Sequence, residues 1–308
     1  MKNYKELISA STVSYLAKQF PDLAPAWIDA FPNEVDRLIE KWQLSPFGHE
    51  GNSRFGTIIY ANSHMYGDVA VKIIPNFSSR LKSEILCYRS LPYKEMCALY
   101  DVDESFGALL LKYIPEITPR DKQREEQVFL SLYEQKREAA NQDRFLPLYE
   151  DVFSEVSRNA VREIRLAKDE SLVPLLSSIQ KSEEGLNDFL NDKRYIIHGD
   201  AHEYNMLHEC AGCVLIDPLG YIAPFEFERS RYLGTAMKHT EMDNDAFFAL
   251  TARMLPKGER MKKQLTAFAI DTTLRACNTF IEGNTYEEIC FAVDWAKRAW
   301  NYAAAYDC

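Results

Sequence analysis

The chain carries the stretch YIIHGDAHEYN at residues 195–205, and VLIDPLG follows at residues 214–220. The apolar, β-branched run at 195–197 predicts a buried strand that leads into a polar loop. Residues 206–207 and 213–216 predict the two short strands of a hairpin. The whole stretch therefore predicts polar side chains held at the ends of buried strands.

Three oxygen-bearing side chains lie at these strand ends: Asp200, Asn205 five residues later, and Asp217 at the end of the second hairpin strand. Mg²⁺ prefers oxygen ligands and usually takes one or two from protein, leaving the others to phosphate and water. Protein kinases use the same spacing, with a first Asp that accepts the substrate hydroxyl proton and a later Asn and Asp that hold Mg²⁺. The spacing predicts Asp200 as the catalytic residue and Asn205 and Asp217 as metal ligands.

The motif His-Gly-Asp-x-His-x-x-Asn at 198–205, with Ile-Asp-Pro-x-Gly at 216–220, differs from that of protein kinases. It resembles the aminoglycoside phosphotransferase-like kinase family, and within it the streptomycin 6-kinase and hydroxyurea kinase branch, where Asp-Pro-x-Gly replaces Asp-Phe-Gly. The resemblance implies a phosphotransferase that uses ATP and Mg²⁺ to phosphorylate a hydroxyl of an aminoglycoside-like or other small acceptor. It also implies a role in antibiotic resistance or in metabolism.

A lysine interrupts the apolar strand predicted at residues 69–75, which read VAVKIIP. Burying the Lys72 ammonium is costly unless it is paired, and Glu84 on the predicted helix 79–89 is the candidate partner. Val-Ala-Val-Lys resembles the kinase strand whose lysine holds the nucleotide phosphates and pairs with a helical glutamate. The alternative is a lysine on the wet face of an edge strand.

Two further segments are candidates for nucleotide contacts. Residues 48–60 place small residues, among them Gly51 and Ser53, between two predicted strands, which suits a hairpin that covers phosphates but equally a plain turn. In a kinase-like plan the strand near residue 112 continues into a hinge, where the backbone of Lys112 to Ile114 would hydrogen-bond an adenine. An ordinary core strand is the alternative there.

The fold predicted from these segments is α/β (α+β), protein-kinase-like and two-lobed. Residues 1–112 would form N-terminal helices and a small antiparallel-sheet lobe that binds nucleotide. Residues 113–308 would form a larger, mainly helical lobe with the catalytic loop and the acceptor site. Helical periodicity runs through residues 1–44, and Pro25 and Pro32 are expected to break it.

Composition limits the function classes. The 308 residues include 46% hydrophobic residues, enough for a sizeable core, and the net charge of −10 argues against a nucleic-acid partner. No long apolar run predicts a membrane span or a signal peptide. The seven scattered cysteines do not form a disulfide framework, which favours a reducing cytoplasm.

A competing site shares the same stretch. His202, His208, Cys210 and Cys213 include a Cys-x-x-Cys and neighbouring imidazoles, so zinc binding or redox chemistry stays open. No second Cys-x-x-Cys exists to complete a structural zinc site. His198 and His202 are better interpreted as loop-shaping residues that hydrogen-bond backbone around Asp200 and Asp217.

Acidic residues after the motif are candidates for contacts with the acceptor. Five acidic residues between 226 and 245 would either face a cationic acceptor or form a solvated face: Glu226, Glu228, Glu241, Asp243 and Asp245. One of these residues, Glu228, follows Phe227. This Phe-Glu pair is expected to be structural, with the Glu228 carboxylate satisfying free N–H groups at a helix start. A non-catalytic nucleotide-binding regulator and a kinase of an unrelated metabolite are the alternative functions.

Overall fold

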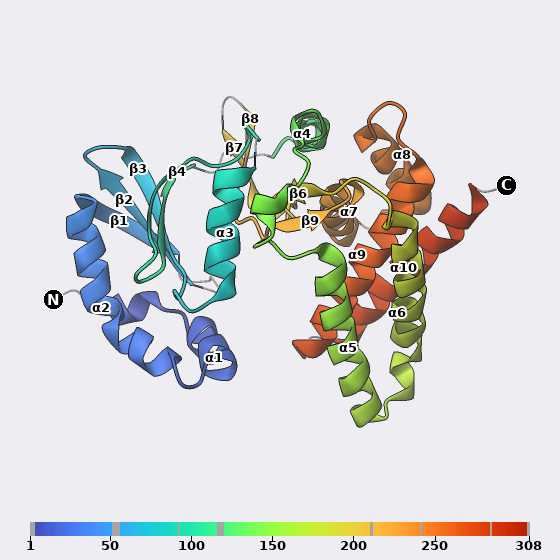
Figure 1. Cartoon of the computed structure of the whole chain (residues 1–308), viewed down its shortest axis with the longest axis horizontal. Coiled ribbons are helices and arrows are strands. Elements are labelled where there is room, and N and C mark those ends of the chain that lie inside the picture. Colours follow the sequence, from blue (N-terminus) through green and yellow to red (C-terminus); the bar gives the residue numbers. More distant parts are fainter. Residues whose placement is uncertain are drawn as a thin grey trace. The chain divides into compact units, whose positions relative to one another are not determined.

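The computed structural model describes residues 4–50, 56–91, 93–115, 120–209, 212–240, 242–283 and 285–306. The chain divides into two compact units (Figure 1). The first, here the N-lobe, consists of Met1–Arg89 and Met96–Glu116, and the second, here the C-lobe, of Ser90–Glu95 and Ile117–Cys308. A small sheet lobe and a larger helical lobe confirm the predicted α+β architecture.

An antiparallel sheet of five strands, in the order β1-β2-β3-β5-β4, forms the N-lobe. Its strands are β1 (Leu44–Glu50), β2 (Thr57–Ser63), β3 (Gly67–Ile73), β4 (Leu99–Asp103) and β5 (Ala108–Lys112). Side chains alternate between the two faces of a strand. The two faces of the sheet therefore carry different sets of side chains.

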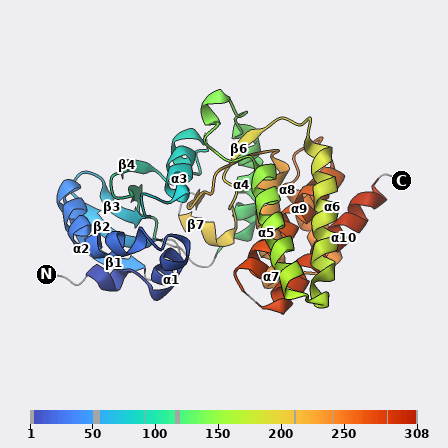
Figure 2. The same cartoon turned by 60° about the horizontal axis from the view of Figure 1, so that its bottom comes forward.

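Helices cover both faces of this sheet (Figures 1 and 2). On one face, α1 (Ala10–Gln19) and α2 (Ala24–Lys41) share a buried apolar core with Val71 and Ile73 of β3. Lys72 points to the other face, where it meets α3 (Ser79–Ser90). The sheet therefore has one mainly apolar face and one face with a buried charge.

Proline does not divide α2 as expected. Pro25 lies in its first turn, where a missing N–H costs nothing. Pro32 lies inside the helix, so the predicted break is wrong. The buried side chains of Phe31, Val35 and Leu38 on either side of it pack into the core, and this packing outweighs the lost backbone hydrogen bond.

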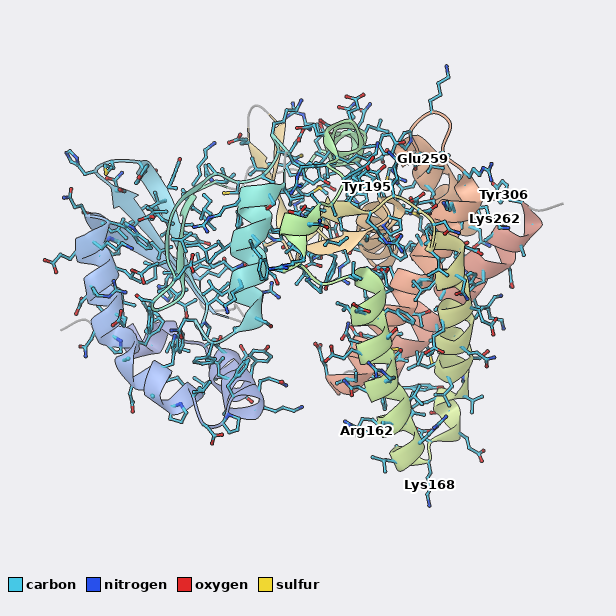
Figure 3. The ribbon with its side chains drawn as sticks, in the orientation of Figure 1. Arg162, Lys168, Tyr195, Glu259, Lys262 and Tyr306 are labelled. Carbon is cyan, nitrogen blue, oxygen red and sulfur yellow. The ribbon has the colours of Figure 1, made fainter. Side chains whose placement is uncertain are left out.

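Seven helices follow in the described part of the C-lobe: α4 (Lys122–Gln135), α5 (Tyr149–Ala167), α6 (Val173–Leu186), α7 (Glu226–Thr240), α8 (Asn244–Met254), α9 (Met261–Ile281) and α10 (Tyr286–Ala305). The mostly buried α9 packs against α5, α6, α7 and α10. Figure 3 marks Arg162 and Lys168 near one end of α5 and Tyr306 just after α10. No helix in the described ranges is long and apolar enough to cross a membrane.

Four short strands lie between α6 and α7. The predicted strand and hairpin are confirmed as β6 (Tyr195–Ile197) and as β7 (Met206–Glu209) paired with β8 (Gly212–Leu215). The sequence did not predict β9 (Tyr221–Ala223), which pairs antiparallel with β6. β6 precedes the polar loop of residues 198–205 and β7 follows it, so these two strands hold its two ends.

Candidate active site

His198 begins the loop of residues 198–205, called here the Asp200 loop. It follows β6, whose first residue, Tyr195, is labelled in Figure 3. The Nδ1 atom of His198 accepts the backbone N–H of Asp200 (3.2 Å), so the proton sits on Nε2, which donates to the carbonyl of Ile216 (2.9 Å). Burial lowers the pKa of the His198 imidazole to about 4, which keeps the ring neutral. The predicted loop-shaping role of His198 is confirmed.

Backbone hydrogen bonds bring this loop and the segment around Asp217 together. The N–H groups of Leu219 and Gly220 both donate to the carbonyl of His198 at 3.0 Å. The N–H of Ile216 donates to the carbonyl of Asn205, also at 3.0 Å. The loop that carries Asp200 and the strand end that carries Asp217 are thus one hydrogen-bonded unit.

Glu228 supports the loop from α7. Its Oε2 accepts the N–H of His198 at 2.6 Å, and the backbone N–H of Gly199 is close enough to favour the charged form of this carboxylate. Burial raises the pKa of the Glu228 carboxyl to about 8, although the two backbone donors act in the opposite direction. Its predicted structural role therefore needs a correction, because the N–H groups that it satisfies belong to the loop and not to the start of its own helix.

Gly199 is required by its conformation and by its neighbour. Its φ is +75°, and a Cβ atom there would lie 2.4 Å from the ring of Tyr221. A side chain at this position would therefore displace β9 from the loop.

Both oxygens of the Asp200 carboxylate are held. Oδ1 accepts from Nε of Arg231 (2.6 Å), and Oδ2 accepts from Nδ2 of Asn205 (3.1 Å). Burial alone would raise the pKa of the Asp200 carboxyl, but the Arg231 charge and a hydrogen bond from His202 outweigh it and hold this pKa well below its usual range. Asp200 is therefore an oriented carboxylate.

The oxygens that would hold a divalent ion come from Asn205 and Asp217. Because Nδ2 of Asn205 also donates to the carbonyl of Asp200 (3.0 Å), its Oδ1 is the atom that remains for a metal. Asp217 has a φ of 58°, a left-handed conformation that costs about 1–3 kcal/mol for residues other than glycine and is concentrated at functional sites. An amide oxygen and a carboxylate suit Mg²⁺. No group of three or more His, Cys, Asp and Glu in the described ranges is arranged to hold a metal.

In the N-lobe the predicted pair of Lys72 and Glu84 is present. Nζ of Lys72 lies 2.7 Å from Oε1 of Glu84, and their side chains are 4% and 0% exposed. The strand that carries Lys72, β3, lies between β2 and β5. The alternative of a lysine on the wet face of an edge strand is therefore wrong.

The structure describes only some of the other residues predicted to contact a nucleotide. Gly51 and Ser53 lie outside the described residues. The N–H of Lys112, at the end of β5, donates to Ala98 (2.9 Å), and that of Tyr113 donates to Asp68 (3.1 Å). These two donors are used within the N-lobe. Ile114 follows them and has a buried side chain.

Sequence reasoning missed an aromatic cluster beside these residues. The ring of Tyr113 lies 5.6 Å from that of Phe47 and 5.1 Å from that of Tyr60. Tyr60 pairs with Ala70, two residues before Lys72, so its side chain lies on the Lys72 face of the sheet. The three rings come from β1, β2 and the end of β5, and only the strand register brings them together.

Arg231 was also missed. Two arginines of α7 lie two residues apart, but Arg229 bonds Gln264 (2.7 Å) and pairs with Glu259, whereas Arg231 reaches Asp200. The sequence contains no signal that separates their roles.

The histidines of the competing zinc or redox site form hydrogen bonds with other groups. Nε2 of His208 lies 2.9 Å from Glu125, and Nδ1 of His202 accepts the N–H of Tyr204. Burial raises the pKa of the Cys213 thiol to about 11, which favours the unreactive form. Cys210 lies outside the described residues.

The acidic residues between 226 and 245 do not form one surface. Glu228 is buried, and Asp243 caps the N-terminus of α8. Glu226 is half-buried and Asp245 is exposed, while Glu241 lies outside the described residues. The expectation of a shared solvated or acceptor-facing face is therefore wrong for Glu228.

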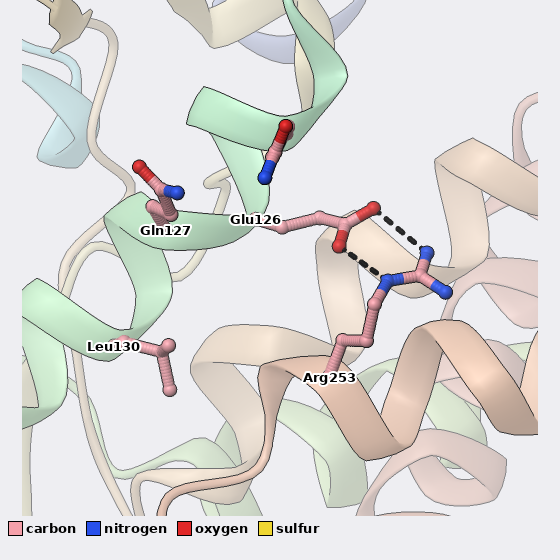
Figure 4. A pocket seen from close by; sticks show the side chains of 5 residues that line it. Glu126, Gln127, Leu130 and Arg253 are labelled. Carbon is pink, nitrogen blue, oxygen red and sulfur yellow. Dashed lines mark hydrogen bonds and ion pairs between the residues drawn. The ribbon is translucent and has the colours of Figure 1, made fainter.

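A hollow of about 490 Å³ lies between α4 and α8, and the residues that line it are not among those predicted for the site. Arg253 and Glu126 join across it through two hydrogen bonds of 2.7 and 2.9 Å (Figure 4). Arg253 is exposed, Glu126 is half-buried, and neither is among the residues predicted for the site, which makes Arg253 a suitable control position.

No protein-family model matches the chain, and a search of curated protein sequences finds no match. Solved structures do match. A thermostable mutant of the aminoglycoside phosphotransferase APH(4)-Ia, in a ternary complex with ADP and hygromycin B, has a TM-score of 0.60 and 12% identity over 86% of this chain and 97% of that one. The chain has the two-lobed fold of kinases.

Two further kinases share this fold. Choline kinase LicA from Streptococcus pneumoniae has a TM-score of 0.60 and 12% identity, covering 88% of this chain and 99% of that one. An aminoglycoside phosphotransferase from Alicyclobacillus acidocaldarius has a TM-score of 0.56 and 12% identity, covering 87% and 92%. At such identities the likeness concerns the fold.

Proposed function

We propose that the protein is a small-molecule kinase that transfers the γ-phosphoryl group of ATP to a hydroxyl of its acceptor. The observation that carries this proposal is the oriented Asp200 carboxylate, which accepts a hydrogen bond from Asn205 of the same loop. Asp217 lies next to Ile216, whose N–H donates to the carbonyl of Asn205, so Asn205 and Asp217 offer two oxygen ligands suited to Mg²⁺. The kinase fold supports it. Catalysis in this chemistry rests almost entirely on positioning and electrostatics.

Three residues of the C-lobe have roles in this proposal. Asp200 orients the acceptor hydroxyl and accepts its proton. Asn205, through Oδ1, and Asp217 hold Mg²⁺. When bound, this ion neutralises negative charge on the transferring phosphoryl group.

The N-lobe supplies the nucleotide contacts. Lys72, steadied by Glu84, holds the upstream phosphates, and the hairpin with Gly51 and Ser53 covers them. Because Lys112 and Tyr113 donate their N–H groups within the lobe, Ile114 is the residue of this segment that supplies an N–H to the adenine.

The aromatic cluster of Phe47, Tyr60 and Tyr113 gives the base a stacking surface. Its rings lie on the same sheet face as Lys72, so one face of the lobe would contact both base and phosphates. Stacking of a base on an aromatic side chain is worth about 1–3 kcal/mol.

A cavity of about 430 Å³ in the C-lobe, between α7, α9 and α10, is the candidate acceptor site. Its lining includes two carboxylates, Glu287 and Glu288, and two aromatic rings, Phe291 and Trp295. The guanidinium of Arg275 also lines it, and this charge is paired with Asp271 at 3.2 Å. Carboxylates and aromatic faces both attract an ammonium group. We therefore favour an alcohol that carries an amine, as an aminoglycoside does.

The test is an acceptor panel. Release of ADP or GDP from Mg-ATP or Mg-GTP is measured with hygromycin B, streptomycin and choline, and with glycerol as an uncharged control. Turnover is expected with at least one amine-bearing alcohol and not with glycerol.

The alternatives give different results. Thermal stabilisation by Mg-ATP without turnover on any acceptor would favour the non-catalytic regulator. Turnover with glycerol alone would retain the kinase and refute the amine-bearing acceptor. No stabilisation by either nucleotide would refute the kinase proposal itself.

A further inference from the structure

Arg231 reaches the Asp200 loop from α7, outside the motif that predicts the site. Its Nε lies 2.6 Å from Oδ1 of Asp200, and the arginine side chain is 26% exposed. A charge-assisted hydrogen bond of this length is among the stronger and more directional ones in proteins. Arg231 is thus in direct contact with the side chain that the proposed reaction needs most.

Two donors from different elements fix the plane of this carboxylate. Arg231 holds Oδ1 from α7, and Asn205 holds Oδ2 from within the loop at 3.1 Å. A carboxylate held through one oxygen can still rotate about its terminal torsion, which is a soft one. The second donor removes that freedom, so Arg231 and Asn205, with Nε2 of His202 3.6 Å from Oδ1, determine where the lone pairs of Asp200 point.

A second ionic layer holds Arg231 in turn. Asp271 on α9 attracts its charge. Asp271 itself accepts from the hydroxyl of Tyr149 (2.9 Å) and pairs with Arg275 (3.2 Å). A Cβ atom at Gly234 would lie 1.6 Å from the Arg275 guanidinium, so this glycine allows Arg275 to pack against α7. Charges of alternating sign therefore run from Asp200 through Arg231 and Asp271 to Arg275.

We propose that Arg231 is a positioning residue for phosphoryl transfer, which holds the Asp200 carboxylate in the orientation that receives the acceptor hydroxyl. This inference rests on the proposed kinase function. Misplacement of a reacting group by about 1 Å can cost a factor of about 10² in rate. Loss of Arg231 should thus lower kcat and leave the affinity for Mg-ATP almost unchanged, because Asn205 and Asp217 remain.

The experiment compares Arg231→Gln, Arg231→Lys and Arg231→Ala with the wild type in the full chain. ADP release is measured with the alcohol that gives turnover in the panel above, and Mg-ATP binding by calorimetry. Arg253→Gln is the matched control, since it removes an exposed arginine of the same lobe that pairs with the half-buried Glu126. Ion pairs at the surface contribute little to stability.

Arg231→Gln is expected to lower kcat by roughly 10²-fold, with the Kd for Mg-ATP changed by less than about twofold. Arg231→Lys restores a charged donor and is expected to recover at least about tenfold of that loss. Added ethylguanidinium should raise the rate of Arg231→Ala. A residue that only stabilises the fold would not give this recovery.

Different results would refute the positioning role of Arg231 and the kinase function. A folded Arg231→Gln variant with a kcat within about twofold of the wild type refutes the positioning role while the kinase function stands. A lysine variant as slow as the glutamine variant, with no rescue by ethylguanidinium, assigns Arg231 a structural role only. A wild type that releases no ADP with any acceptor refutes the kinase function and this inference with it.

Discussion

Glu228 accepts the backbone N–H of His198 at 2.6 Å from a side chain that is completely buried. Three residues later on the same helix, Arg231 holds the carboxylate of Asp200. Helix α7 therefore positions Asp200 in two ways. Glu228 holds the backbone of His198, two residues before Asp200, and Arg231 holds the side chain of Asp200. A reacting group in a loop is oriented more precisely when side chains of a rigid helix hold it, which favours catalysis.

Removing the Glu228 carboxylate should destabilise the protein. In Glu228→Ala the N–H of His198 loses its acceptor, and an unsatisfied buried group costs about 1–3 kcal/mol. Glu228→Gln keeps an acceptor oxygen and should retain most of the stability. Urea unfolding of both variants measures the difference, and equal losses would show that the hydrogen bonds to this side chain do not matter.

The same residue should make stability depend on pH. Burial raises the pKa of Glu228 from 4.5 to about 8, so the folded state binds this proton more tightly than the unfolded state does. Its favourable contribution is complete below the unfolded pKa and is lost as the pH rises through the folded pKa, with a slope of up to about 1.4 kcal/mol per pH unit.

Glu228→Gln removes this titration. The free energy of unfolding of the variant, minus that of the wild type, should therefore increase between about pH 5 and about pH 8. Other titrating groups largely cancel in the difference. Urea unfolding at four pH values checks this, and a difference that stays constant would mean that Glu228 is ionised throughout the range.

Asp217 should be needed for nucleotide binding more than for folding. Its φ of 58° is tolerated by asparagine, so Asp217→Asn should fold with almost unchanged stability. An amide is a poorer Mg²⁺ ligand than a carboxylate, so the affinity for Mg-ATP should fall. Asp217→Ala should lose the same affinity and in addition about 1–2 kcal/mol of stability, because alanine is strained at this backbone conformation.

Calorimetric titration of Mg-ATP and urea unfolding separate these two effects. If Asp217→Asn bound Mg-ATP as tightly as the wild type does, its assignment as a metal ligand would be wrong.

Local patterns in the sequence were sufficient for the core of the candidate site. The strand 195–197, the hairpin that follows and the pair of Lys72 and Glu84 were all predicted, because alternating or β-branched runs and a buried charge without a local partner are local signals. Pro32 shows where such signals fail. Packing of α2 against the sheet outweighs a local rule, and no pattern within the helix reports that packing.

Arg231 and the aromatic cluster required three-dimensional information. The arginine is one of several charges on a helix, and its contact with Asp200 depends on how α7 lies beside the loop. Phe47, Tyr60 and Tyr113 are separated in the chain and meet only through the register of β1, β2 and β3 and the end of β5. Strand register is determined by long-range pairing, which sequence periodicity does not specify.

The aromatic cluster should contribute to nucleotide affinity. Phe47→Ala removes a ring that is 55% exposed and lies 5.6 Å from that of Tyr113, so the fold should tolerate it. The loss of one stacking partner should weaken Mg-ATP binding by about 1–3 kcal/mol.

Tyr66→Ala is the matched control, because Tyr66 stacks on Tyr100 at 4.6 Å in the same lobe but outside the cluster. Calorimetry with Mg-ATP should show a loss in Phe47→Ala only. Equal affinities in both variants would assign the cluster to packing.

Asp200 should determine the rate of phosphoryl transfer and not the binding of nucleotide. Asp200→Asn keeps the size of the side chain and an oxygen that can accept from Arg231, but it removes the carboxylate that receives the proton. Turnover should therefore fall by roughly 10²-fold or more, as for other positioned bases. The Kd for Mg-ATP should change little, because the proposed metal ligands Asn205 and Asp217 are retained. A phosphoryl-transfer assay together with calorimetry distinguishes this loss of rate from the loss of affinity expected for Asp217→Asn. Normal turnover in Asp200→Asn would show that another group receives the hydroxyl proton.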